Sequence, residues 1–184
     1  MLDIAQVLLW SAAYVCIILA MLGKKEMPLA IPVIVAVSNL SWELAAVIVS
    51  GMWAHWLWLG LDVVILTACL WRTPKWRSRA MALGAAAVLV ACYQWLFTVE
   101  NGMLYSSFVI DLFMAVCFLV FRKKLSTKLA LPIAVLKLLG DICAGIYYGM
   151  DDMLIAVIAV AVLLCNVMDL FICVERRNHN GTTV

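Results

Sequence analysis

Six ionisable side chains lie within long apolar stretches of this chain. An ionisable group near the centre of a membrane helix costs roughly 2.5–3.5 kcal/mol, so such groups are kept where they pair or carry a function. A carboxyl group in a dry environment can stay protonated and act as a general acid. Any one of these groups could instead hydrogen-bond between helices, but the set favours a function such as proton transfer. The six residues are Glu43, Asp62, Asp111, Lys137, Asp141 and Asp169.

Aromatic and amide side chains accompany these carboxyl groups at helical spacing. Asn39 lies one turn before Glu43, Trp42 adjoins Glu43, and Trp58 lies one turn before Asp62. The π faces of such aromatic rings can stabilise a cation, although aromatic residues also simply fill space. The candidate binding residues are therefore Asn39, Trp42, Trp58, Asp62, Trp95, Asp111, Tyr147 and Asn166.

Lys137 and Asp141 are four residues apart and therefore share one face of a helix. Opposite charges at this spacing can neutralise each other inside hydrocarbon. We interpret these two residues as a structural ion pair.

The sequence lacks the motifs of metal and nucleotide sites. There is no Gly-rich phosphate loop, HExxH or GxSxG sequence, and none of the seven cysteines forms a CxxC pair. The two histidines, His55 and His179, are far apart, so a metal site built on histidine is not expected. Asp151 and Asp152 stand in a short turn without further carboxylates, which indicates a solvated turn. We predict neither a metal nor a cofactor.

Composition places these residues in a membrane protein. Of the 184 residues, 67% are hydrophobic and 13% are charged, far from the mix of a soluble globule. A membrane-spanning helix needs roughly 20 apolar residues. The sequence therefore predicts an all-α protein with one transmembrane domain, residues 1–184, and seven helices, about 4–22, 28–50, 55–71, 79–99, 103–121, 129–149 and 153–174.

The basic residues predict the orientation of these helices. All but Lys137 follow the first, third, fifth or seventh apolar run, whereas the opposite ends carry Asp3, the His55 turn and Glu100. Because basic loops stay in the cytoplasm, we expect an external N-terminus and a cytoplasmic C-terminus. The net charge of +2 thus reflects membrane topology and does not suggest a nucleic-acid partner.

Two similar segments suggest an internal repeat. Residues 24–32 and 124–132 both join consecutive helices and place a proline near the start of the second one. Helices one to three, residues 1–71, would then correspond to helices five to seven, residues 101–177, with 79–99 as a linker helix. An odd number of linker helices gives a parallel 3+1+3 repeat. The alternative is that the two helical hairpins look alike without being repeats.

The stretch Asn39-Leu40-Ser41-Trp42-Glu43 resembles a signature of the integral-membrane terpene cyclases. These are seven-helix enzymes of fungal meroterpenoid and indole-diterpene pathways and of bacterial indole-sesquiterpenoid pathways. Segments 58–62 and 134–140 are also similar to the family, and residues 165–169 occupy the position of its last-helix aspartate. The short loops suit a bacterial form, and hence a bacterial cytoplasmic membrane.

The resemblance implies an enzyme that protonates a prenyl alkene or epoxide and guides a carbocation cyclisation. The family's acidic pair would correspond to Glu43 and Asp169, with Glu43 as the proton donor. The expected partners are a prenylated small molecule, such as a prenylated indole, that enters from the bilayer, and membrane lipids. The depths of Glu43 and Asp169 in their helices differ by about 13 Å at the helical rise per residue, so Asp62 or Asp111 could share the pocket instead.

Another class of protein also fits the pattern. A parallel 3+1+3 repeat with early prolines resembles the sugar and PQ-loop transporters, in which central polar residues would bind a solute and couple protons. No Pro-Gln pair occurs here, and the acidic residues are divided unequally between the halves. A scaffold role would explain neither the buried acids nor Trp42.

Overall fold

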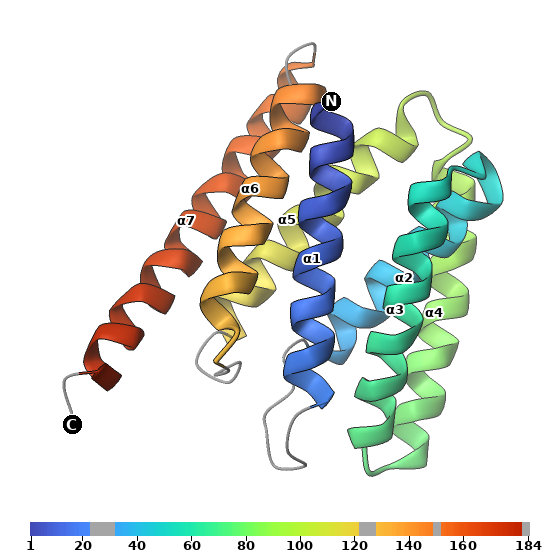
Figure 1. Cartoon of the computed structure of the whole chain (residues 1–184). Helices are drawn as coiled ribbons and strands as arrows, with labels where there is room; N and C mark the ends of the chain where they lie inside the picture. Colours follow the sequence, from blue (N-terminus) through green and yellow to red (C-terminus); the bar gives the residue numbers. More distant parts are fainter. Residues whose placement is uncertain (23–31, 122–127, 149–151, 182–184) are drawn as a thin grey trace. The chain divides into compact units, whose positions relative to one another are not determined.

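The computed structural model describes residues 1–22, 32–121, 128–148 and 152–181, and it confirms the seven predicted helices. Within these residues the chain forms helices and turns, with no strand. In chain order the helices are α1 (Leu2–Leu22), α2 (Val33–Ser50), α3 (Trp53–Arg72), α4 (Trp76–Leu96), α5 (Gly102–Phe121), α6 (Ala130–Tyr148) and α7 (Met153–Gly181) (Figure 1).

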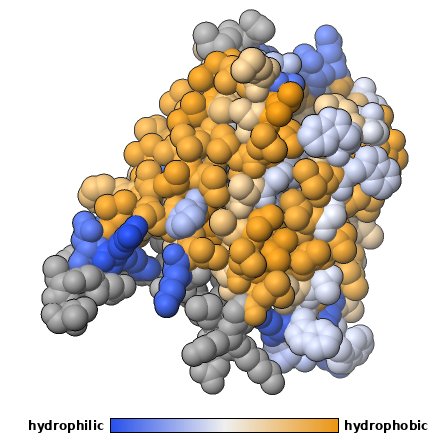
Figure 2. Space-filling view, viewed as in Figure 1, coloured by the Kyte–Doolittle hydropathy of each residue, from blue (hydrophilic) through white to orange (hydrophobic). Residues whose placement is uncertain are grey.

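Each of these helices is long and apolar enough to cross a membrane. Figure 2 shows a face covered mainly by hydrophobic side chains, with hydrophilic residues gathered toward the helix ends. Large apolar residues such as Leu8, Val88 and Phe171 are exposed on the helices, where lipid rather than water would cover them. The chain is therefore an integral membrane protein.

Several helix boundaries differ from the sequence prediction, among them the start of α2 at Val33 and not 28, and the ends of α4 and α7. α4 ends at Leu96, because the backbone leaves the helix at residues 97–101 in a turn where Asn101 has a φ of 56°. α7 continues to Gly181, past the predicted end at 174, so its last turns include the charged residues Glu175 to Arg177. A helix can extend beyond the hydrocarbon because its backbone hydrogen bonds are internal.

The chain divides into two compact units. Unit 1 consists of residues 1–30 and 114–184, which include α1, α6, α7 and the second part of α5. Unit 2 consists of residues 31–113, which include α2, α3, α4 and the first part of α5. This division differs from the predicted repeat halves, since α1 belongs with α6 and α7. The superposition of helices one to three on helices five to seven stays a prediction.

A tight turn joins α2 to α3 in unit 2. Gly51 follows α2 with a φ of 63°, a left-handed conformation that glycine adopts without steric cost, and its N–H donates to the carbonyl of Val47. Ser50 Oγ donates to the carbonyl of Ala46 and accepts the N–H of Met52, which precedes α3. The short turn makes α2 and α3 antiparallel neighbours, and it thereby sets which of their side chains face each other.

α2 also packs against α4. Ser41 is fully buried, and its hydroxyl group contacts the carbonyl of Val37 on its own helix at 2.7 Å and that of Ala86 on α4 at 3.2 Å. Trp42, Ala46 and Ile110 form a buried cluster in this unit, against which Tyr93, Phe97 and Met103 pack. These contacts hold the polar face of α2 toward α3.

In unit 1, α1 packs closely against α6. A Cβ atom at Gly140 would lie 2.7 Å from Cδ1 of Trp10, so this position admits only glycine unless the indole moves. The neighbouring residue Asp141 accepts the indole N–H of Trp10 at 2.9 Å. The absence of a side chain at position 140 thus allows the ring and the carboxyl group to meet.

We expect Gly140→Ala to destabilise the protein by about 1–3 kcal/mol, the usual cost of overpacking. The matched control is Gly145→Ala on the same helix, where the added Cβ would lie 3.6 Å from that of Ala159, an ordinary contact. Thermal unfolding of both variants in detergent measures the difference. Equal melting temperatures would show that Trp10 does not lie against Gly140.

Membrane topology gives a second prediction. Because all basic residues except Lys137 lie at or beyond the ends that follow α1, α3, α5 and α7, a reporter fused after Val184 should report a cytoplasmic location. A tag at Met1 should be accessible from outside. An external C-terminus would contradict the predicted orientation.

Some residues used in the sequence analysis lie outside the described residues. They are the basic residues Lys24, Lys25 and 122–124, Asp151, and residues 24–31 of the proline hairpin.

Candidate active site in unit 2

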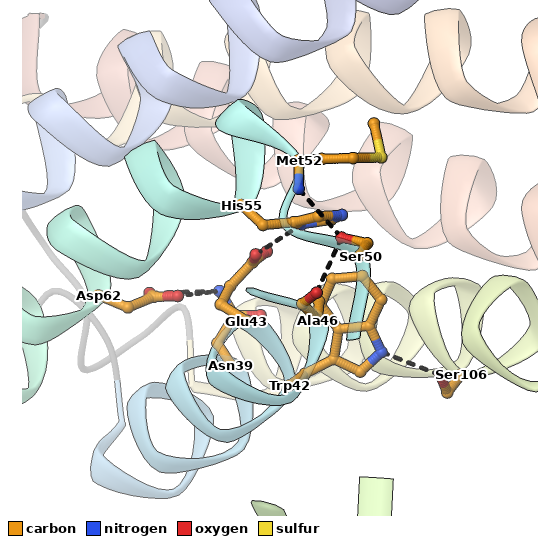
Figure 3. A network of polar contacts seen from close by, with 9 residues as sticks. All are labelled: Asn39, Trp42, Glu43, Ala46, Ser50, Met52, His55, Asp62 and Ser106. Carbon is orange, nitrogen blue, oxygen red and sulfur yellow. Dashed lines mark hydrogen bonds and ion pairs between the residues drawn. The ribbon is translucent and has the colours of Figure 1, made fainter. Parts of the chain in front are cut away.

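Glu43 and His55 form a buried pair between α2 and α3. The Nδ1 atom of His55 lies 2.9 Å from Oε2 of Glu43, and the two residues are only 7% and 5% exposed (Figure 3). The sequence placed His55 at the start of the third predicted helix, beside a turn, and did not indicate that its side chain is buried. The turn consists of residues 51 and 52, whereas His55 lies in the first turn of α3 and its ring points inward. The acid of the Trp-Glu motif therefore has a titratable partner.

Asn39 and Asp62 form a second pair between the same helices. The side-chain amide nitrogen of Asn39 lies 3.1 and 3.3 Å from the two carboxyl oxygens of Asp62, which is 1% exposed. An amide nitrogen can only donate, so both Asp62 oxygens accept from it. The Glu43 carboxyl group differs, because its histidine partner can either donate or accept a proton.

Aromatic rings surround the Glu43–His55 pair. The His55 ring makes edge contacts with Trp42 and with Trp58, at centroid distances of 5.3 and 5.9 Å. Trp42 also contacts Phe97 at 5.8 Å, and its indole N–H donates to the Ser106 hydroxyl of α5 at 2.9 Å. The hydrogen bond fixes the orientation of the indole. Trp42, at 6% exposure, is deep in the unit as predicted.

A separate polar cluster occupies unit 1. Asp141 accepts hydrogen bonds from Trp10 and from the side-chain amide of Asn166 on α7, while the charge of Lys137 acts on it. Lys137 is 1% exposed, and its ammonium group lies 3.8 Å from the ring centroid of Phe118. Asn166, which the sequence placed beside Asp169, thus binds Asp141. The structural ion pair of Lys137 and Asp141 stays a prediction.

The remaining predicted site residues lie elsewhere. Asp169 is buried in unit 1, so its predicted partnership with Glu43 of unit 2 stays a prediction. Asp111 is half-buried on α5. Trp95 is a predicted binding residue, and its side chain is 71% exposed, because α4 buries little of its surface. Tyr147 is 50% exposed and packs edge-on against Tyr148.

Sequence reasoning missed His55, Ser106 and Trp10 as partners of the polar residues. For His55 a signal was available, since Asn39 and Asp62 lie about equally far from Gly51, as do Glu43 and Trp58. In a tight antiparallel hairpin, residues equally far from the turn lie opposite each other on the two helices. His55 lies one turn from Trp58 on the same face of its helix, so it could be expected near Glu43. For Ser106 and Trp10 no such signal exists, because their partners are distant in sequence.

The pairs in unit 2 combine a proton donor and a proton acceptor in a water-poor, aromatic environment. Within the described part of the chain, no group of three or more His, Cys, Asp or Glu side chains is placed to hold a metal ion. The arrangement can give a proton to a bound molecule and can stabilise positive charge on it.

Comparisons of the chain with protein-family models, with curated proteins and with solved structures gave no match.

Proposed function

We propose that this chain is a membrane-embedded terpene cyclase, which protonates the alkene or epoxide of a prenylated substrate and guides its cyclisation. The observation that carries the proposal is the buried Glu43–His55 pair, flanked by Trp42 and Trp58. A cyclisation of this kind needs an acid protected from water and ring faces beside the developing cation. Both are present on adjacent helices.

In this proposal Glu43 acts as the general acid. Its carboxyl proton moves to the terminal alkene carbon or the epoxide oxygen, and the resulting cation is attacked by the next double bond, which closes a ring. Loss of a proton from the final cation ends the reaction. Asp169 takes part in orienting or recycling the proton, and Asn39, Trp42, Trp58 and Asp62 contact the substrate. Because no diphosphate leaves, the reaction requires neither a metal ion nor a cofactor.

The membrane location supports a greasy substrate. Apolar side chains cover the helices, so a prenyl chain dissolved in the bilayer can approach the protein sideways. A prenylated indole or a related meroterpenoid precursor combines such a chain with a polar head.

The proposal is tested by supplying membranes that contain the protein with prenylated indoles and with their terminal epoxides. A cyclised product with the mass of the substrate is expected, because cyclisation is an isomerisation. Membranes without the protein serve as the control. If no member of either series is converted, the proposed substrate class is wrong.

A further inference from the structure

We propose that His55 is a proton relay that reloads Glu43 from the membrane surface at the turn between α2 and α3. The inference rests on the proposed role of Glu43 as the acid, and it adds a residue for which the cyclase proposal alone gives no role. It starts from a kinetic requirement. A buried acid that gives its proton to the substrate must regain one before the next turnover, and 95% of Glu43 is screened from solvent.

The position of His55 fits this requirement. It lies in the first turn of α3, two residues after Trp53, and Met52 and Trp53 are 52% and 62% exposed. A turn between two membrane spans lies at the membrane surface. Figure 3 shows Nδ1 of His55 directed to Glu43, while the opposite side of the ring faces away from it. Along the hairpin His55 is therefore closer than Glu43 to the membrane surface, and its ring contacts the carboxyl group.

The transfer balances in protons and electrons. Neutral His55 accepts a proton from water on Nε2, and an N–H bond forms there. The proton on Nδ1 then moves to Oε2 of the Glu43 carboxylate, so that one N–H bond breaks and one O–H bond forms. The ring is again neutral but in its other tautomer. It resets when Nδ1 takes up the proton that the final cation of the cyclisation loses and Nε2 returns its proton to water, so that no proton is gained or lost over one turnover. Histidine suits this role because its two nitrogens exchange donor and acceptor roles.

The surroundings of the pair keep the ring in place for this transfer. Edge contacts with Trp42 and Trp58 hold the imidazole on two sides. Other titratable groups of the packed helices include Asp62 on α3, which accepts from Asn39, and Tyr93 on α4, which packs against the cluster around Trp42. From α5 the polar residue in contact with Trp42 is Ser106, which does not titrate.

The test separates the first turnover from later ones. In His55→Asn the side-chain amide can still hydrogen-bond to Glu43 near the position of Nδ1, but it cannot carry a proton. The substrate is one that wild-type membranes convert. When purified protein is in excess over this substrate, the rate of the single turnover should be the same for His55→Asn and for the wild type. With substrate in excess, the rate should fall at least about tenfold, less than the roughly 10²–10⁴ of a lost general acid, because water can still reach Glu43 slowly.

Two further variants complete the test. In His55→Ala, added imidazole should restore part of the steady-state rate, which a purely structural role would not allow. His179→Asn, the same substitution at the other histidine of the sequence, should turn over like the wild type. Equal steady-state rates for His55→Asn and the wild type would overturn the relay while leaving the cyclase intact. Equal losses in both regimes would assign His55 to the proton transfer to the substrate itself and would also overturn the relay. Absence of conversion by the wild type would overturn the proposed function and the relay with it.

Discussion

Glu43→Gln is expected to fold and insert normally but to lose at least about a hundredfold in cyclisation rate, the lower range for removal of a general acid. Glutamine keeps the volume of the side chain and can hydrogen-bond to Nδ1 of His55, so the hairpin of α2 and α3 should persist. It has no carboxyl proton to transfer. The measurement is the rate of product formation by purified protein, normalised to the folded fraction.

The matched control for this variant is Glu100→Gln. Glu100 lies in the exposed turn between α4 and α5 and undergoes the same chemical change. It should retain the wild-type rate. Asp169→Asn should also lose at least about a hundredfold if Asp169 takes part in the proton transfer. Full turnover by Glu43→Gln would remove Glu43 from the mechanism, and Asp62 and Asp111 would become the next acids to test.

The second large effect is expected on stability at Lys137. Lys137→Met removes a buried cation whose charge acts on Asp141 and whose ammonium group lies against the Phe118 ring. An unpaired charge would remain on Asp141, and breaking a buried pair in this way costs about 3–5 kcal/mol. Denaturation of the protein in detergent micelles measures the loss.

A double variant separates charge from hydrogen bonding in this cluster. Asp141 accepts from Trp10 and from Asn166, so an apolar replacement would leave both donors without an acceptor. Lys137→Met combined with Asp141→Asn removes both charges and keeps an acceptor oxygen for Trp10. It should recover much of the lost stability. If Lys137→Met alone is as stable as the wild type, Lys137 is not part of a structural pair.

The number and type of helices could be predicted from sequence because the signal is strong and local. Runs of apolar residues of membrane-spanning length are visible without any knowledge of packing. Gly51 likewise marks the turn between the second and third helices. The ends of α4 and α7 were less predictable, since neither polarity nor proline fixes the residue at which an exposed helix stops.

The site could be predicted only in part. Glu43, Trp42, Asn39 and Asp62 were found because polar groups in apolar runs are rare and therefore informative. Their pairing was not, because helical spacing shows only neighbours on one helix. Asn39 was expected beside Glu43 but donates to Asp62 on the next helix.

His55 shows the limit of reasoning from charge and position along the chain. A histidine at the edge of a predicted span is compatible with a solvent-exposed turn and with a buried first turn of a helix. Trp95 shows the converse, since a tryptophan in an apolar run can face lipid as readily as a pocket. The direction of a side chain depends on which face of its helix is packed, which the apolar pattern of a membrane helix does not reveal.

The most direct test of the central claim is product analysis with the wild-type protein purified in detergent micelles, in the presence of a metal chelator. Detergent micelles do not separate two aqueous compartments. A transporter would therefore leave the substrate in such a sample chemically unchanged. The substrate is one that membranes containing the protein convert. We expect the purified wild type to turn it into a ring-closed isomer of the same mass, and we expect the Glu43→Gln variant to form almost none of this product. A substrate that stays unchanged in micelles, but that the protein moves across sealed vesicles, would contradict the assignment as a cyclase.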